Sequence, residues 1–290
     1  MAFVEVNNLS LKYKKFEALK NISFNLDNGK IYGLLGRNGA GKTSLLSVLS
    51  SFRKVSEGNI KILGEEPYEN AEIMKNIAFH YEATYKEDTT KVKAMLKYVK
   101  MYRPNYDEKY AQHLVELFKL PLNKPVNKLS KGMQSALEVT MGLASRSPIT
   151  IFDETYLGMD APTRVKFYEE LLRDQSNHPR IFILSTHLVS EMDYLFDEIL
   201  MLHNGRLLLH EEYETLTSKG INITGQTDVI DAFIKGKKIL NEQQLGNTKT
   251  VMLFEERTEA FDREAISKGI MVNPVSLQDL FIHMTEEVEK

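Results

Sequence analysis

The sequence contains no cysteine and no tryptophan, and its apolar residues are spread over short runs. Without cysteine, neither disulfide bonds nor thiolate metal sites can form. A membrane-spanning helix needs about 18 to 20 uninterrupted apolar residues, and no stretch of this chain approaches that length. Residues 1–16 interleave charges and carry no apolar core of signal-peptide length. We therefore expect a cytoplasmic protein that reaches a membrane only through another chain.

A strong excess of one charge is also missing. The 37 Lys and Arg residues face 40 Asp and Glu residues, for a formal net charge of −3. This balance gives no reason to expect nucleic acid or an acidic lipid surface as the main partner. At 290 residues the chain is long enough to bury a large core, and its length predicts one or two domains.

A glycine-rich segment is the most informative feature that is present. It follows an apolar, strand-like run at residues 30–35 and precedes a helix-like run at 44–49. Its glycines let successive backbone N–H groups point at phosphate oxygens, and the positive end of the following helix faces the same anion. Lys42 would reach the β- and γ-phosphates, and Thr43 would offer its hydroxyl to Mg²⁺. The segment predicts an ATP-binding loop made of Gly36, Arg37, Asn38, Gly39, Ala40, Gly41, Lys42, Thr43 and Ser44.

Two later apolar runs end in polar clusters. Residues 149–152 lead into Asp153 and Glu154, and residues 180–184 lead into a Ser-Thr-His segment that ends at His187. The helical stretch between them predicts neighbouring parallel strands, whose carboxyl ends collect the chemistry of such sheets. Asp153 would hold Mg²⁺ through water, and Glu154 would orient and deprotonate the water that attacks the γ-phosphate. The alternative is that two acids end a strand and face solvent.

The remaining pattern predicts how the chain is divided. Strands are expected at residues 3–6, 9–13, 22–26 and 58–64, and the period becomes helical from about 91 to 120 and again after Ser130. Beyond residue 209 the pattern changes to short alternating segments and a final helix near 276–286. We expect a nucleotide-binding domain at 1–212, with a helical insert at about 83–146, and a C-terminal accessory domain at 213–290.

An ordered set of motifs resembles the ABC-type ATPases. Residues 129–134, Leu-Ser-Lys-Gly-Met-Gln, are similar to the family's signature, whose usual form is Leu-Ser-Gly-Gly-Gln. Residues 158–160 resemble its D-loop, residues 185–187 resemble its switch-histidine segment, and Tyr13 stands at the place of the aromatic residue on which adenine stacks. The resemblance runs from about Phe3 to Leu209. It implies an α/β fold, a P-loop ABC-type ATPase core with an antiparallel β-subdomain, a helical subdomain and a small C-terminal α+β domain.

The same resemblance implies an assembly. In this family two nucleotide-binding domains pair head to tail, so that the signature helix of one covers the ATP held by the other. Ser130 and Gly132 would contact that ATP, Asp160 belongs to the D-loop, and His187 would reach the γ-phosphate or its water. An ordinary N-cap explains Ser130 equally well, and a lone histidine is often structural. A second ATPase subunit, identical or related, and integral membrane permease subunits are implied, with the chain peripheral on the inner face of the cell membrane.

Three places depart from the family pattern. Glu82 stands where the family usually carries a glutamine that links Mg²⁺ to the membrane partner, and a carboxylate can bind the ion but cannot donate a hydrogen bond. Lys131 and Met133 replace Gly and Gln in the signature, and Thr155 replaces the usual proline after Glu154. Lys131 could lie near phosphate or simply be solvated. Hydrolysis of ATP is still expected, because the chain keeps Lys42, Thr43, Asp153, Glu154 and His187.

Narrower similarities indicate export. The lysine in the signature, Glu82 and residues 102–107 resemble exporter ATPases of Gram-positive bacteria encoded beside a GntR-type repressor, including the staphylococcal exporter of phenol-soluble modulins. Residues 275–281 resemble the tail of many drug and peptide exporter ATPases, although an ordinary amphipathic helix explains the same pattern. We expect the ATP-hydrolysing subunit of an exporter of peptides or amphipathic, toxic compounds, working by dimer closure. The alternatives are a soluble ABC ATPase that remodels ribosomes or nucleic acid, and a low-turnover regulatory subunit.

A docking surface for the membrane subunit is expected between Glu82 and Tyr106. This stretch lies between the predicted sheet and the signature helix, where the family receives a short helix of the membrane chain. Aromatic residues are enriched at interface hot spots, so Tyr85 and Tyr102 are candidate exposed anchors.

Overall fold

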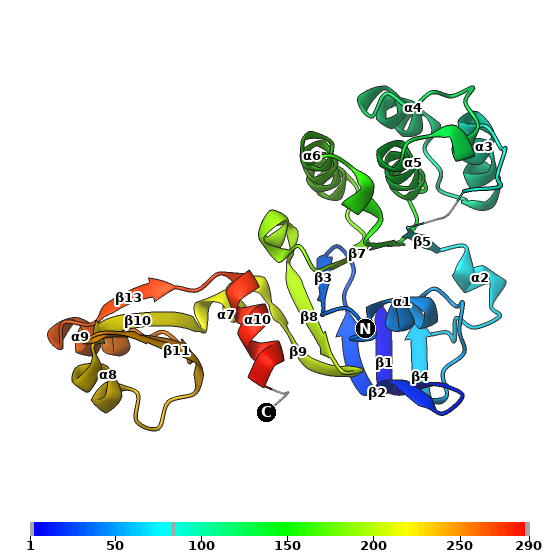
Figure 1. Cartoon of the computed structure of the whole chain (residues 1–290). Helices are drawn as coiled ribbons and strands as arrows, with labels where there is room; N and C mark the ends of the chain where they lie inside the picture. The colour runs from blue at the N-terminus through cyan, green and yellow to red at the C-terminus, as the bar shows by residue number, and fades with distance from the viewer. Residues whose placement is uncertain (1–2, 83–84, 288–290) are drawn as a thin grey trace.

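The chain folds into a larger part that contains two sheets and a smaller C-terminal part built on a third sheet (Figure 1). The structure is a computed structural model, and it describes residues 3–82 and 85–287. Within these ranges, no helix combines the length and the apolar character needed to cross a membrane.

The central sheet positions the site. Its six strands lie in the order β5-β6-β7-β3-β8-β9, and all adjacent pairs are parallel except β8 and β9. Strands β6 and β7 are neighbours in register, with Asp153 opposite Ser185, which confirms the predicted parallel pair. Both strands are buried along their whole length, as their continuous apolar sequences require. The bounds are β3 Ile31–Leu35, β5 Ile77–Tyr81, β6 Ile149–Asp153, β7 Ile181–Thr186, β8 Glu198–His203 and β9 Arg206–Glu212.

Helix α1 (Lys42–Leu49) packs with its apolar side chains between the central sheet and a second, antiparallel sheet. The order of this second sheet is β2-β1-β4, with β1 at Val4–Tyr13, β2 at Phe16–Leu26 and β4 at Glu57–Ile62. The expectation of two separate strands within residues 3–13 was wrong. Strand β1 is continuous, because a register shift between Val6 and Leu9 absorbs the break in the alternating pattern and the pairing with β2 resumes.

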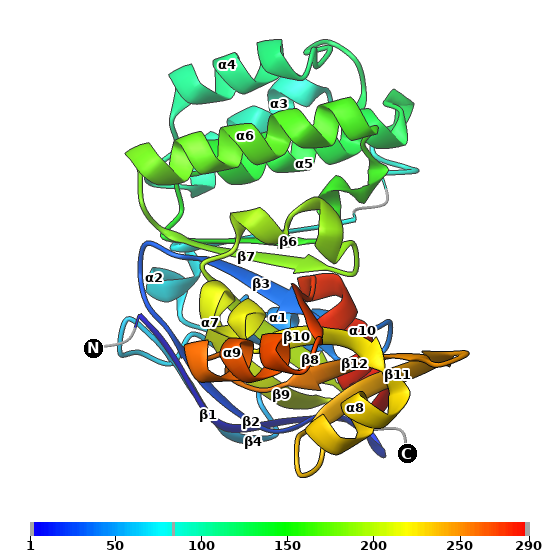
Figure 2. The ribbon, with the colours of Figure 1, turned by 90° about the vertical axis from the view of Figure 1, so that its left-hand side faces the viewer.

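Helices α3 to α6 gather on one side of the central sheet, whereas α1 and α2 lie on the other side (Figure 2). Helix α5 is the most deeply placed, and its residues 135–144 are all buried. Ser130, Asp107 and Asp160 cap the N-termini of α5, α4 and α6 with their side chains. The first residues of the expected helical insert, 83–84, lie outside the described residues. The bounds are α2 Ala71–Met74, α3 Val92–Tyr102, α4 Glu108–Leu117, η1 Val126–Lys128, α5 Lys131–Ala144, η2 Thr155–Gly158, α6 Ala161–Asn177, η3 Val189–Glu191 and η4 Asp193–Leu195.

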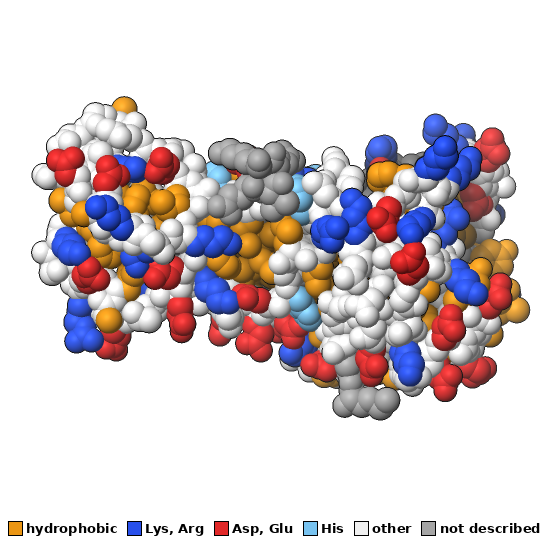
Figure 3. Space-filling view, turned by 90° about the horizontal axis from the view of Figure 1, so that it is seen from below, with side chains coloured by type: hydrophobic (Ala, Val, Ile, Leu, Met, Phe, Trp, Pro, Cys, Tyr) orange, Lys and Arg blue, Asp and Glu red, His pale blue; other side chains and the backbone are white. Residues whose placement is uncertain are grey.

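The C-terminal part has its own antiparallel sheet, in the order β11-β12-β10-β13, and its own apolar core, which includes Ile221, Val251 and Phe261. Seen from below, hydrophobic side chains gather in the recess between this part and the rest of the chain (Figure 3). Its last helix joins the larger core instead, through Leu277 and Leu280. The bounds are α7 Tyr213–Ser218, β10 Gly220–Gln226, α8 Thr227–Phe233, β11 Ile239–Leu245, β12 Thr248–Phe254, α9 Glu259–Ser267, β13 Met271–Pro274 and α10 Leu277–Glu287.

Candidate nucleotide site

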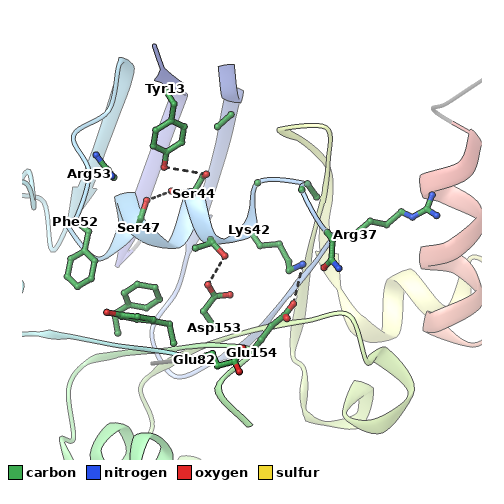
Figure 4. Close-up of a pocket in the computed structure, with 18 of the residues that line it drawn as sticks. Tyr13, Arg37, Lys42, Ser44, Ser47, Phe52, Arg53, Glu82, Asp153 and Glu154 are labelled. Atoms are coloured by element: carbon green, nitrogen blue, oxygen red, sulfur yellow. Dashed lines mark hydrogen bonds and ion pairs between the residues drawn. The ribbon is translucent and has the colours of Figure 1, made fainter. Parts of the chain in front are cut away.

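The glycine-rich loop connects β3 to α1 and lines a cavity of about 1020 Å³ (Figure 4). Gly41 has a φ of +108°, which an L-residue rarely adopts, and it directly precedes the first helical residue. A Cβ at Gly36 would lie 3.0 Å from the carbonyl oxygen of Leu202, so a side chain there would force the loop off the sheet. Because the first N–H groups of a helix have no partner within it, this geometry leaves a place for phosphate at the start of α1.

Lys42 extends back along the loop. Its side chain is only 7% exposed, its Nζ donates to the carbonyl oxygen of Gly36 at 2.7 Å, and it lies 3.4 Å from Oε1 of Glu154. A buried ammonium is stable only when it is paired, so Glu154 serves as its counter-ion in this structure. Arg37, in the same loop, points away from Lys42 toward helix α10 (Figure 4).

Asp153 ends β6 directly below the loop. Its Oδ2 accepts a hydrogen bond from Thr43 Oγ1 at 2.8 Å, and its Oδ1 accepts one from Ser185 at the end of β7. A hydroxyl and a carboxylate that meet beside a phosphate loop are hard oxygen donors of the kind that Mg²⁺ prefers. Among residues 3–82 and 85–287, no three His, Asp or Glu side chains form a metal cage. These donors therefore fit an ion that is shared with water and phosphate.

Glu154 and His187 face each other across the carboxyl ends of β6 and β7. Glu154 Oε1 lies 3.1 Å from His187 Nδ1, and the carboxylate is partly accessible. Glu154 adopts a φ of +52°, the left-handed region, which turns the chain sharply out of the strand and into η2. The structure thus brings both expected catalytic side chains to one edge of the sheet; Glu154 contacts Lys42, whereas His187 contacts Glu154 but does not line the cavity.

Tyr13 and a group of aromatic residues line the far end of the cavity. The Tyr13 hydroxyl lies 3.5 Å from Ser44 Oγ, and the guanidinium of Arg53 lies 5.5 Å from the centre of its ring. Phe16 also lines the cavity and is 66% exposed. An apolar, aromatic end opposite a phosphate loop can hold a planar base. The cavity is also lined by Phe52, Arg53 and Phe79, which no motif indicates because they belong to segments that come together only through the fold.

Glu82 follows β5 and lines the same cavity on the side opposite the loop. Its Oε1 lies 3.4 Å from Lys131 Nζ, at the start of α5, and both side chains are well exposed. Two of the departures from the family pattern therefore contact each other within the chain. Lys131 is thus exposed to solvent in this chain, and its partner is a carboxylate.

Other expected site residues lie elsewhere. Ser130, Gly132 and Asp160 do not line the cavity that holds Lys42. Ser130 accepts a hydrogen bond from the Met133 N–H at 3.3 Å, as an N-cap does. Asp160 caps α6, and hydrogen bonds from Thr163 hold the pKa of its carboxyl below the usual value. Within this single chain Ser130 and Gly132 are therefore not part of the cavity formed by the glycine-rich loop.

Comparison with known protein families identifies one match. The model described as "ABC transporter" matches residues 19–156, which include the phosphate loop, the signature and the pair Asp153 and Glu154.

Known relatives match nearly the full length. The chain is 27% identical to the uncharacterised ABC transporter ATP-binding protein YcbN of Bacillus subtilis, over 96% of this chain and 92% of that protein. It is 27% identical to the bacitracin transport ATP-binding protein BcrA of Bacillus licheniformis, over 92% of this chain and 83% of that protein. Both alignments extend into the C-terminal part.

A solved structure described as the ATP-binding subunit of an ABC transporter superposes with a TM-score of 0.65 at 24% identity. The superposition covers 72% of this chain and 90% of the chain in that structure. This similarity establishes the fold of the larger part.

Proposed function

We propose that the chain, as the ATP-binding subunit of an ABC transporter, drives an exporter of peptides or amphipathic, toxic compounds. The main support for ATPase activity is that Lys42, Asp153 and Glu154 line one cavity. Export is favoured by the tail at residues 275–281 and by the long alignment with a bacitracin transport protein. The substrate would contact mainly the membrane subunits.

We further propose a role for each residue of the site. The loop Gly36–Ser44 and Lys42 bind the phosphates, Tyr13 stacks on the adenine, and Thr43, Asp153 and Glu82 face the metal side. A bound Mg²⁺ would neutralise charge on the β- and γ-phosphates. Glu154 takes the proton of the attacking water, and His187, 3.1 Å away, orients that carboxylate. The proximity of Glu154 and His187 supports a subunit that hydrolyses ATP, in preference to a low-turnover regulatory subunit.

The active form would be a head-to-tail dimer, with an identical or related second subunit. Ser130 and Gly132 lie at the accessible N-terminus of α5, away from this chain's own Lys42. A helix N-terminus attracts anions, so the signature is suited to the ATP of a partner. ATP would close the dimer because it binds the closed state more tightly than the open one.

We also propose that residues 1–212 are the ATPase domain and that residues 213–290 are an accessory domain. The separate core of the C-terminal sheet supports this division. The ATPase would lie on the cytoplasmic face of the membrane through its permease subunits.

The surface of α3 is the proposed docking site for a permease subunit. Tyr98, Met101 and Tyr102 are 53%, 73% and 68% exposed and follow the helical spacing of one face. The expectation that Tyr85 is an exposed anchor was wrong, because Tyr85 is 9% exposed and donates a hydrogen bond to Glu138. Replacing the two exposed tyrosines with alanine should remove apolar contacts without disturbing the core.

The test is co-purification from detergent-solubilised membranes, with mass spectrometry of the proteins recovered. Tyr98→Ala combined with Tyr102→Ala should lower recovery of a membrane subunit about tenfold, since a hot-spot side chain typically contributes more than about 1 kcal/mol. Basal ATPase activity of the isolated chain should stay unchanged. Leu245→Ala, which removes an 87% exposed side chain of the C-terminal part, is the control. Recovery of ribosomes and no membrane protein would replace the exporter proposal with the soluble remodelling alternative.

A further inference from the structure

A second, smaller cavity lies behind the nucleotide site, between the end of β5, the first half of α5 and η2. It measures about 420 Å³, and its lining includes Glu82, Tyr85, Lys131, Glu138 and Thr155. Glu82, Lys131 and Thr155 are three of the residues that depart from the family pattern. Because these departures meet in one place, they form a local network of contacts that the motifs do not reveal.

The centre of this network is a buried carboxylate. Glu138, in the middle of α5, is 6% exposed. One of its oxygens lies 2.7 Å from His80 Nδ1, and the other accepts a hydrogen bond from the Tyr85 hydroxyl. A buried carboxylate is strongly unfavourable without such partners. Glu138 therefore needs both contacts to remain buried in its charged form.

The two partners of Glu138 flank Glu82 in the sequence. His80 stands two residues before Glu82, and Tyr85 stands three residues after it. Burial, followed by the charge of Glu138, raises the pKa of the Tyr85 hydroxyl, which therefore remains a donor. Contacts with α5 thus lie before and after Glu82 in the sequence.

Further contacts add to this attachment with different strengths. The Lys131–Glu82 pair spans 3.4 Å, but both side chains are more than 70% exposed, and such pairs contribute little because water and salt screen them. Thr155 Oγ1, next to Glu154, donates to the carbonyl oxygen of His80 at 3.1 Å. The buried contacts of Glu138 therefore dominate the attachment.

We propose that Glu138, held by His80 and Tyr85, is a positioning residue that makes Glu82 and the N-terminus of α5 move together. Glu82 lines this chain's own ATP cavity, whereas Ser130 at the start of α5 would cover the ATP of a partner chain. Glu138 lies eight positions after Ser130 along α5, which corresponds to a rigid span of about 12 Å. The clamp formed by His80, Tyr85 and Glu138 therefore links the two ATP sites of a dimer. This inference rests on the head-to-tail dimer proposed above.

Hydrogen exchange in the monomer tests the clamp without requiring the dimer or turnover. The full-length chain is diluted until light scattering shows a monomer, and peptides covering residues 77–82 and 129–134 are followed with and without Mg²⁺ and ATP. In the wild type, ATP should slow exchange in both peptides, with an effect at 129–134 of about fivefold, the lower end of typical coupling between sites. In Tyr85→Phe and Glu138→Ala, only peptide 77–82 should respond.

Conservative variants separate positioning from general damage. Glu138→Gln keeps an acceptor oxygen for Tyr85 and should restore part of the response at 129–134. Tyr194→Phe removes the hydroxyl of a 56% exposed tyrosine and should behave as the wild type. If Glu138→Ala fails to fold, the response of peptide 129–134 in Tyr85→Phe is sufficient to test the clamp. A response at 129–134 that persists in Tyr85→Phe, or that is absent from the wild type, overturns the clamp. Failure of the transporter proposal would instead be seen as a lack of ATP-dependent dimers and of hydrolysis.

Discussion

Neutralising Glu154 should have two opposite effects, because this carboxylate is both the proposed base and the counter-ion of Lys42. As the base, its replacement by glutamine removes the acceptor for the water's proton, and such losses typically slow turnover about 10² to 10⁴-fold. As the counter-ion, its Oε1 lies 3.4 Å from the buried Lys42 ammonium. In the nucleotide-free chain, Glu154 therefore competes with the phosphates for Lys42. Glu154→Gln should bind ATP more tightly while it hydrolyses almost none.

The distance sets the size of the affinity change. Two unit charges at 3.4 Å attract by about 5 kcal/mol at an effective dielectric constant of about 20, which is an upper limit. Glu154 is 25% exposed, and Lys42 keeps its bond to the Gly36 carbonyl, so solvent and that bond recover much of this energy. A net change of about 1 to 2 kcal/mol remains, which corresponds to about 5 to 30-fold tighter binding.

Calorimetric titration with ATP in the presence of EDTA measures this change without contributions from the metal. Glu82→Gln is the matched control, since it removes the same charge from the same cavity but from a side chain paired with Lys131. That variant should change ATP affinity less than about twofold, because screened charges at a distance interact weakly. His187→Ala should also retain wild-type affinity, since it leaves the pair between Lys42 and Glu154 intact.

Two results would refute the reasoning. Wild-type turnover in Glu154→Gln would show that another group accepts the proton. Equal tightening of ATP binding in Glu154→Gln and Glu82→Gln would show that only the net charge of the cavity matters, and that the contact with Lys42 has no specific role.

The remaining predictions concern the binding of the adenine ring by Tyr13 and the helix cap formed by Asp107. Tyr13→Ala should weaken ATP binding by about 1 to 3 kcal/mol, and Tyr13→Phe should restore it, because the 3.5 Å contact with Ser44 is long. Unchanged affinity in the alanine variant would move the stacking role to Phe16, the exposed aromatic residue beside it. Asp107 caps α4, and the N–H of Tyr110 holds its pKa below the usual value, so its stabilisation is present above about pH 4 and is lost as the pH falls through the folded-state pKa. Urea unfolding should show Asp107→Ala destabilised by about 1 kcal/mol at pH 7, less at pH 3, and Asp107→Asn nearly unaffected.

Local motifs explain why the phosphate side of the site could be predicted from the sequence. The loop at 36–44 and the acids that end β6 are each determined by a few consecutive residues. Their meeting follows from the rule that parallel strands place their carboxyl ends at one edge. The sequence contained no information, however, about which side chain neutralises Lys42, because Glu154 lies 112 positions further along the chain.

Burial of aromatic and charged side chains was the least predictable property. Tyr85 and Tyr102 look alike in the sequence, yet Tyr85 reaches a carboxylate 53 positions away, whereas Tyr102 faces solvent. The sequence does indicate one buried charge: Glu138 is the charged residue within the run Ala136–Ala144, whose other members are apolar or small. A lone charge on a buried helix face requires a partner, and the search for that partner leads to the segment 80–85.

The C-terminal part is attached to the larger part by packing near His187, one of the proposed catalytic residues. Leu277, Leu280 and Phe281 of α10 are buried in the core of the larger part, so these residues form the apolar face of an amphipathic helix. Helix α10 packs against η3, which begins two residues after His187. Arg37 of the glycine-rich loop also points toward this helix (Figure 4). Because α10 packs against η3 and its apolar side chains are buried in the larger core, a shift of α10 must be accommodated by the segment that follows His187.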